Sequence, residues 1–260
     1  MAYKNIDLRT EDNIGILTIN RPKALNALNS ATIKEIRAVL AEISGEEAIK
    51  VLIITGAGDK AFVAGADIGE IEDRGLKDSF DFVRRGHQMN HEIETLGIPT
   101  IAAVNGLALG GGCELAMSCT LRVVSQTAKL GLPELGLGVM PGYGGTQRLA
   151  RLIGKGRALW YLLTGDMIDA KQAVDIGLAN LMVEPDELMD KTLEVAKKVA
   201  TKAPLAAKMA LFAVKYGTET DLETGLVLES ALSNVTLASE DKNEGIAAFF
   251  EKRKPDYKGK

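Results

Sequence analysis

Short apolar runs rich in β-branched residues alternate with amphipathic helical patterns through the first half of the chain. The runs cover residues 14–20, 51–55, 101–104 and 121–124. The run at 51–55 has no polar residue before Thr55, which is typical of a strand buried on both faces. Helical patterns cover residues 32–43 and 78–96. Strands that alternate with helices predict an α/β fold whose strands are mainly parallel and in one sheet.

After about Asn180 the pattern is that of helices alone. Pro185 and Pro204 each stand where a helix is expected to begin, and further helices are expected over residues 222–238 and 243–254. The apolar faces of these helices exceed what a small α/β core covers, so we expect them to pack on the core and on neighbouring subunits. The sequence therefore predicts two regions, a core over residues 1–185 and a helical region over residues 186–260, with a solvated tail after residue 251.

Composition and charge exclude several classes of protein. The chain has 260 residues, 46% of them hydrophobic, and a formal net charge of −4. This balance offers no electrostatic basis for binding nucleic acid or anionic membranes. The first residues do not read as a secretory signal, and the most apolar long stretch, residues 100–118, contains Asn105 and Glu114 and does not read as a membrane span. Cys113 and Cys119 suggest no disulfide framework, so we expect a cytoplasmic protein.

Two short motifs resemble known ligand sites but lack the context that those sites need. Residues 56–61 read as the opening of a dinucleotide-binding fingerprint, but no helix follows the glycines directly, so we interpret them as a tight turn. His87 and His91 have the spacing of zinc ligands on a helix. They are the only histidines, and Gln88 stands where a zinc protease has its general base. We expect neither a metal nor a nicotinamide or flavin cofactor.

Three glycines precede a helix in the segment over residues 101–117. Without side chains, Gly110, Gly111 and Gly112 let backbone N–H groups approach a ligand, and the first N–H groups of a helix are unpaired at its positive end. Such donors stabilise a developing oxyanion. Glu114 falls in the first turn of this helix. On the residues alone, catalysis and simple complementation of the helix dipole explain Glu114 equally well.

A second acidic residue, Glu134, stands 20 residues later among apolar neighbours. A carboxyl group in apolar surroundings has a raised pKa, which suits proton transfer near neutral pH. Two glutamates in two glycine-rich segments resemble a paired-carboxylate acid–base site, although spacing alone does not bring them together. In a third segment, residues 62–68, the N–H of Ala66 is a candidate second oxyanion donor, and Asp67 is a candidate helix cap; the alternative is a plain loop.

Together these segments resemble the enoyl-CoA hydratase (crotonase) family, and its bacterial short-chain members most closely. The resemblance runs in family order along almost the whole chain, through residues 20–28, 55–68, 101–119, 132–149, 164–178 and 244–255. It implies a spiral of ββα units followed by a helical region that packs between subunits. It also implies a homotrimer or a homohexamer built from two trimers.

The resemblance implies a mechanism residue by residue. The N–H groups of Ala66 and Gly111 would hold the thioester oxygen of an acyl-CoA, while Glu114 and Glu134 hold one water between them. Glu134 matches the proton donor to the α-carbon, and Glu114 matches the partner that activates the water. Contacts with CoA are implied for Lys23, Ala24, Ala64, Ala66, Asp67, Ile68, Gly69, Gly111, Phe249 and Lys252. The acyl-CoA is the substrate, and no cofactor is implied.

The presence of both acids favours reversible syn-hydration of a trans-2-enoyl-CoA, because double-bond isomerases of this fold often keep only one. An enoyl-CoA isomerase and a cyclic dienoyl-CoA hydratase remain alternatives on the same scaffold. Tyr143 stands where many members have a small residue, so we expect a short or compact acyl chain. An RNA-binding relative is disfavoured because the matching helix mixes Lys34 and Arg37 with glutamates. A non-catalytic assembly protein is disfavoured because both acids are present.

Overall fold

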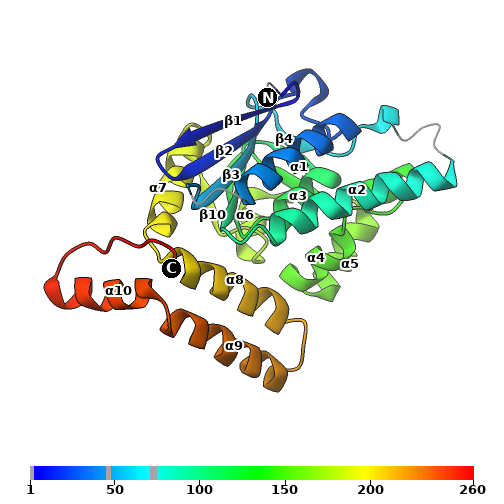
Figure 1. The fold of residues 1–260 in the computed structure, drawn as a ribbon. Coiled ribbons are helices and arrows are strands. Elements are labelled where there is room, and N and C mark those ends of the chain that lie inside the picture. Colours follow the sequence, from blue (N-terminus) through cyan, green and yellow to red (C-terminus); the bar gives the residue numbers. More distant parts are fainter. Residues whose placement is uncertain (1–2, 45–47, 71–74) are drawn as a thin grey trace.

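The computed structural model describes residues 3–44, 48–70 and 75–260. Within these residues the strands form two sheets (Figure 1). The larger sheet has the order β1 (Ile6–Glu11), β2 (Ile14–Ile19), β3 (Val51–Gly56), β5 (Thr100–Val104), β7 (Leu121–Ser125) and β10 (Leu181–Val183). The smaller sheet has the order β4 (Ala61–Ala64), β6 (Leu107–Leu109), β8 (Lys129–Gly131) and β9 (Ile168–Asp169). Most neighbouring strands run parallel, and the pairs β1–β2 and β8–β9 are antiparallel.

The predicted α/β class is confirmed, but the single sheet is wrong. The chain repeatedly crosses from a strand of the larger sheet to a strand of the smaller one and then enters a helix, as in β3–β4–α2 and β5–β6–α3. These are ββα units, as the family resemblance implied. The strands of the smaller sheet have only two to four residues. Such short strands leave too few residues for a periodic pattern, so the sequence gives no sign of a second sheet.

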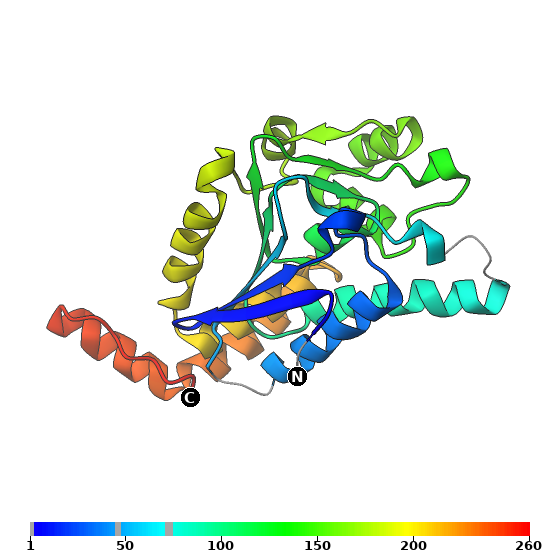
Figure 2. The ribbon, with the colours of Figure 1, turned by 90° about the horizontal axis from the view of Figure 1, so that it is seen from above.

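Helices cover both sides of the larger sheet (Figures 1 and 2). One side carries α1 (Ser30–Ser44), α2 (Leu76–Glu94) and the short α3 (Gly111–Ser118), every residue of which is buried. The other side is covered by α7 (Leu188–Ala200), which packs on β2, β3, β5 and β7 through Leu188 and Ala196. Two more helices, α4 (Gly145–Ile153) and α5 (Lys155–Thr164), lie between β8 and β9 in the chain, and α6 (Ala170–Asp175) follows β9.

The C-terminal helices stand apart from this core. The helices α8 (Pro204–Gly217) and α9 (Leu222–Leu237) lie side by side, and α10 (Glu240–Glu251) projects beyond them in both views (Figures 1 and 2). Neither α8 nor α9 has a buried residue. Large apolar side chains of α9 and α10 face solvent in the single chain, among them Leu226, Val227, Phe249 and Phe250. No helix in the described part of the chain is both long and apolar enough to cross a bilayer.

Most residues of the tail after α10 are exposed, as predicted, but the helix boundary and the path of the tail differ from a free solvated end. The helix runs over residues 240–251 rather than 243–254, and the tail folds back onto it. The buried Asp241 carboxylate accepts hydrogen bonds from the N–H groups of Lys258 and Gly259, at 2.7 and 2.9 Å. Arg253 pairs with Glu244 at 2.6 Å. These contacts are made mostly by backbone N–H groups, which the sequence of the tail does not reveal.

Candidate active site

The helix that carries Glu114 begins at a tight glycine turn. Gly110 has a φ of +49°, which glycine adopts readily, and its N–H donates to the Gly131 carbonyl oxygen at 2.9 Å. The helix α3 follows at Gly111, so the Gly111 N–H lies at the positive end of the helix with no intrahelical partner. A Cβ on Gly112 would overlap the Val63 carbonyl of β4. The glycines therefore let the start of the helix lie directly against the smaller sheet.

Ala66 lies two residues beyond the end of β4 and turns its N–H toward this helix start. The residues on either side of Ala66 bond to Leu28, because the Leu28 N–H donates to Gly65 and the Asp67 N–H donates to Leu28, each at 2.9 Å. Neighbouring peptides of an extended chain point in opposite directions, so the Ala66 N–H points away from Leu28. A Cβ built on Gly111 would lie 3.4 Å from the Ala66 nitrogen. Two backbone donors from separate segments thus lie side by side.

Glu114 is 1% exposed and is held by two backbone donors. Its Oε1 accepts hydrogen bonds from the N–H groups of Tyr143 and Gly145, at 2.8 and 2.6 Å. Burial raises the pKa of Glu114 to about 7 and the charge of Glu134 adds to the rise, although the Gly145 and Tyr143 N–H groups and Arg148 oppose it. Both bonds fall on Oε1. The other oxygen makes no hydrogen bond to any residue that the structure describes.

Glu134 reaches the same place from the 3₁₀ helix η3 (Glu134–Leu137). A Cβ on Gly110 would lie 2.9 Å from Glu134 Oε1, so this carboxyl group contacts the turn that opens α3. Its Oε2 is buried and has no hydrogen-bond partner among the described residues. Burial raises the pKa of Glu134, as its apolar flanks predicted. Buried carboxyl oxygens are usually hydrogen-bonded, so this oxygen is free to bond a water or a ligand group.

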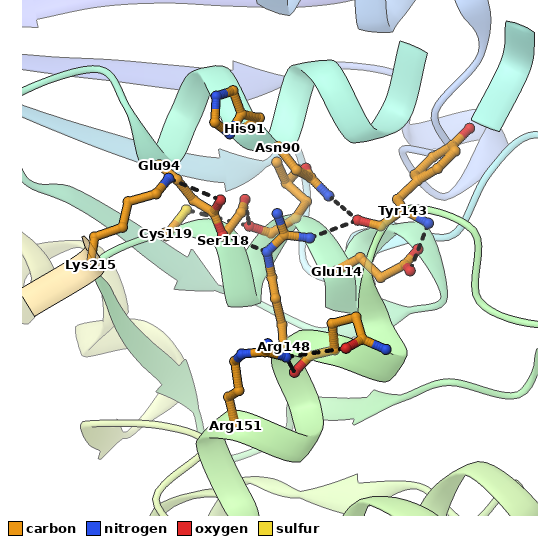
Figure 3. Close-up of polar contacts among 12 residues, drawn as sticks. Asn90, His91, Glu94, Glu114, Ser118, Cys119, Tyr143, Arg148, Arg151 and Lys215 are labelled. Atoms are coloured by element: carbon orange, nitrogen blue, oxygen red, sulfur yellow. Dashed lines mark hydrogen bonds and ion pairs between the residues drawn. The ribbon is translucent and has the colours of Figure 1, made fainter. Parts of the chain in front are cut away.

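The loop over residues 143–145 is the part of the site that sequence reasoning missed. Its PGYGG sequence predicted a flexible turn. The structure instead uses two of its backbone N–H groups, those of Tyr143 and Gly145, to hold Glu114. Figure 3 shows the bond from Tyr143. Gly144 has a φ of +102°, and a Cβ on Gly145 would lie 2.9 Å from Glu114 Oε1. The glycines were the available signal: a turn that excludes side chains at two adjacent positions indicates a close approach to another group.

Comparison with known proteins shows to which family a chain with this site belongs. The family model described as enoyl-CoA hydratase/isomerase matches residues 9–260. The chain belongs to this family. It is 46% identical to the short-chain-enoyl-CoA hydratase of Clostridium acetobutylicum over 98% of this chain and 97% of that protein. It is 44% identical to the crotonyl-CoA hydratase of Syntrophomonas wolfei over 99% of both chains. The crystal structure of the enoyl-CoA hydratase from Bacillus anthracis superposes with a TM-score of 0.97 at 39% identity, over 99% of this chain and 100% of that chain.

The structure brings together most of the residues to which the enoyl-CoA hydratase/isomerase resemblance assigned CoA contacts. Lys23 and Ala24 lie in the 3₁₀ helix η1 (Pro22–Ala24), and the next carbonyl, of Leu25, accepts a bond from the Ala64 N–H at 3.0 Å. This bond sets η1 beside the segment that contains Ala64, Ala66, Asp67, Ile68 and Gly69. Lys23 of η1 and Ile68 and Gly69 of the neighbouring segment are exposed to solvent.

Asp67 has a different role from the predicted helix cap. Its carboxylate pairs with the guanidinium of Arg21 at 3.0 Å, and Arg21 also donates to the Ala27 carbonyl oxygen. A local sequence pattern predicts a cap, but a partner 46 residues away is invisible to it. The ion pair ties the segment before η1 to the segment that holds Ala66.

Phe249 and Lys252 are not brought to the two glutamates. Phe249 lies on α10 and is 78% exposed, and Lys252 ends that helix with a φ of +56°. The helix α10 lies far from α3 and α4 in both views (Figures 1 and 2). Within one chain these two residues are separate from the site.

The structure also shows where the two short motifs that resemble ligand sites lie, together with the two cysteines. Residues 56–61 contain the tight turn that joins β3 to β4, as interpreted: Gly56 ends β3, and Ala61 begins β4. His87 and His91 are exposed on α2, and no cluster of potential metal ligands occurs among the described residues. Cys113 and Cys119 are free thiols buried in the main hydrophobic core.

Proposed function

We propose that the protein catalyses reversible hydration of a trans-2-enoyl-CoA. The observation that carries the proposal is the convergence of two buried glutamates, Glu114 and Glu134, beside the paired N–H groups of Ala66 and Gly111. The two curated relatives described above, whose names specify short-chain and crotonyl substrates, support it. Both acids are present, as hydration requires, and their environment raises the pKa of each.

In the proposed reaction the two N–H groups and the two carboxyl groups have separate roles. The thioester oxygen accepts hydrogen bonds from Ala66 and Gly111, which stabilise the enolate oxygen as negative charge develops there. A water held between the carboxyl groups loses a proton to Glu114, and its oxygen bonds to the β-carbon. Electrons of the double bond move toward the thioester, and Glu134 gives a proton to the α-carbon. Both new bonds form on one face of the double bond. Transfer of the proton from Glu114 back to Glu134, through the next water, restores the pair, so one water is consumed in each turnover.

The proposed reaction is redox-neutral, so it needs no electron carrier. The N–H groups of Ala66 and Gly111 polarise the carbonyl, a role that a Lewis-acidic metal plays in other enzymes. We therefore propose that the acyl-CoA is the only small molecule needed besides water. Incubation with a strong chelator should leave turnover unchanged, and loss of activity that added metal restores would contradict this view.

The direct test follows crotonyl-CoA with purified protein by loss of the conjugated-thioester absorbance. The expected product is 3-hydroxybutyryl-CoA. A product with a shifted double bond and no added oxygen would instead support the isomerase alternative. Turnover of cyclic dienoyl thioesters alone would support the other alternative.

We propose a short acyl substrate because of Tyr143. Its ring is 2% exposed and lies against Gly111, Gly86 and the Phe82 ring, whose centroid is 5.6 Å away. We expect Tyr143→Ala to raise the ratio of hexenoyl-CoA to crotonyl-CoA turnover roughly tenfold, because the volume of the ring becomes available to the acyl chain. Tyr143→Phe is the matched control and should keep the ratio. An unchanged ratio in a folded Tyr143→Ala protein would show that the ring does not limit chain length.

We also propose a trimer or a pair of trimers in the cytoplasm. The exposed apolar side chains of α9 and α10 support burial against other subunits, because patches of this kind mark protein interfaces. In such an assembly Phe249 and Lys252 of one subunit would reach the CoA of another. Light scattering coupled to size-exclusion chromatography gives the oligomeric mass, and a monomer would contradict the proposal.

The raised pKa of Glu114 predicts how stability depends on pH. Because its pKa is about 7 in the folded state and 4.5 ordinarily, the stabilising contribution of its protonated form is full below pH 4.5 and is lost as pH rises through 7. Glu114→Gln lacks this titration. The free energy of unfolding of the variant, relative to wild type, should therefore rise by about 3 kcal/mol over this range. Urea unfolding at several pH values measures it, and parallel profiles for the two proteins would contradict the burial of this carboxyl group.

A further inference from the structure

A series of polar contacts links the C-terminal helical region to Glu114 (Figure 3). Lys215 of α8 donates to Oε2 of Glu94 at 3.2 Å, and Arg148 of α4 donates from Nε to Oε1 of the same carboxylate at 2.5 Å. Arg148 also donates from Nη1 to the Tyr143 carbonyl oxygen at 2.8 Å. The N–H of Tyr143 in turn donates to Glu114. None of the contacts before Glu114 involves a group that touches the substrate in the proposed reaction.

Arg148 holds the middle of the loop that binds Glu114. The Tyr143 carbonyl lies between the two N–H donors along the chain, and its oxygen accepts a second bond from Asn90 Nδ2 of α2 at 3.0 Å. A Cβ on Gly144 would overlap Nη1 of Arg148, so the guanidinium lies directly on the loop backbone. Donors from two helices therefore fix the peptide between the N–H groups of Tyr143 and Gly145.

Arg148 is itself anchored by charge. Its side chain is 18% exposed, and those of Glu94 and Lys215 are each 24% exposed. Burial alone would raise the pKa of Glu94, but hydrogen bonds and charges from Arg148 and Lys215 bring its pKa below the usual value. The carboxylate is thus ionised at neutral pH and holds the guanidinium with a charge-assisted bond.

We propose that Arg148 is a positioning residue that fixes the loop over residues 143–145 so that its two N–H groups bind Glu114, with Glu94 and Lys215 as its anchors. Its effect on turnover rests on the proposed hydratase function, whereas its effect on the Glu114 carboxyl group does not. The arrangement makes the geometry of Glu114 depend on α8, which belongs to the C-terminal helical region.

The direction of the expected change follows from the groups that act on Glu114. In the described part of the chain the charged groups that act on Glu114 are Glu134 of η3 and Arg148 of α4. The Cys113 thiol on the same helix has its pKa raised by burial and by Glu114, and His87 of α2 has its pKa lowered by burial and by Arg148. Loss of Arg148 removes a nearby cation and loosens two N–H donors. Both changes favour the protonated carboxyl group, so the pKa of Glu114 should rise.

The test compares Arg148→Met with Arg151→Met. Arg151 lies on the same helix and pairs with Glu219 at 2.9 Å, so the control removes an arginine–glutamate pair from α4 without touching the loop. Arg148→Met should lower kcat for crotonyl-CoA roughly 10- to 100-fold, with KM changed less than about threefold. The acid limb of its kcat/KM profile should move to higher pH. Arg151→Met should leave kcat, KM and the acid limb unchanged.

Two further variants separate positioning from simple stability. Arg148→Lys should recover part of kcat, because one ammonium group reaches either the Tyr143 carbonyl or Glu94 but lacks the fork that binds both. Lys215→Met should move the acid limb in the same direction by less. If Arg148→Met lowers the thermal midpoint but keeps kcat and the acid limb, Arg148 is only structural and the proposal is overturned.

An infrared titration of the protonated Glu114 carboxyl group needs no turnover. Its band is assigned by its loss in Glu114→Gln, and its midpoint should lie at higher pH in Arg148→Met than in wild type. If the wild type hydrates no enoyl-CoA but the midpoint shifts, the proposed function fails and the positioning role stands. An unshifted midpoint overturns the positioning role whatever the activity.

Discussion

Replacing Glu134 with glutamine should lower kcat for crotonyl-CoA hydration by about a thousandfold or more, equivalent to about 4 kcal/mol of barrier. The amide keeps the shape of the side chain beside Gly110 but does not deliver a proton to the α-carbon. Glu114→Gln should have an effect of similar size, because the amide does not take a proton from the water. Its oxygen still accepts from the Tyr143 and Gly145 N–H groups, so the fold should persist.

The double variant distinguishes a shared water from two independent groups. If both carboxyl groups act on one water, Glu114→Gln with Glu134→Gln should be little slower than the slower single variant. Glu187→Gln, at an exposed position in the 3₁₀ helix η4 (Pro185–Glu187), is the matched control and should keep full activity. Fully additive losses, or near wild-type kcat in Glu134→Gln, would contradict the assignment of the pair. Steady-state kinetics gives kcat for the four variants and for wild type, and thermal midpoints show that each variant is folded.

Two glycine-to-alanine substitutions in helices should have opposite results. In Gly112→Ala the new methyl group meets the Val63 carbonyl, which is backbone of β4 and has no room to move aside. We expect a loss of about 3 kcal/mol in the free energy of unfolding, together with at least a hundredfold loss of kcat, because α3 carries both Gly111 and Glu114.

Gly156 is the matched control for this substitution. It lies in α5, and a Cβ there would meet no atom within 4 Å. Gly156→Ala should therefore raise stability by about 0.5–1 kcal/mol, because alanine favours helix more than glycine does, and leave kcat unchanged. Chemical denaturation and the crotonyl-CoA assay measure both variants. Equal stabilities of the two variants would show that α3 is not packed directly against β4.

Elements with a clear apolar run or a helical pattern were predictable from the sequence. The runs at 51–55 and 101–104 became the buried strands β3 and β5, and the stripe at 32–43 became α1. Pro204 marked the start of α8 correctly. The smaller sheet was not predictable, because β6 has three residues and β9 has two, and their positions are set by pairing with distant strands.

At the site, side-chain chemistry was easier to predict than backbone contacts. Glu114, Glu134 and the glycines around Gly111 were singled out by residue type and local context. The N–H groups of Tyr143 and Gly145 carry no sequence signature, because every residue except proline has one. Arg148 was missed for another reason: its partners Glu94 and Tyr143 come from different elements, and only the fold brings them together.

Glu114 and Glu134 are proposed to act from the same side of the substrate, so that the hydroxyl group from the water and the proton from Glu134 add to one face of the double bond. Hydration of crotonyl-CoA in D₂O, followed by NMR of the 3-hydroxybutyryl-CoA formed, tests this claim most directly. The product should carry one deuterium at the α-carbon, on the same face as the new hydroxyl group. Addition on opposite faces, or deuterium at the γ-carbon without a new hydroxyl group, would contradict it.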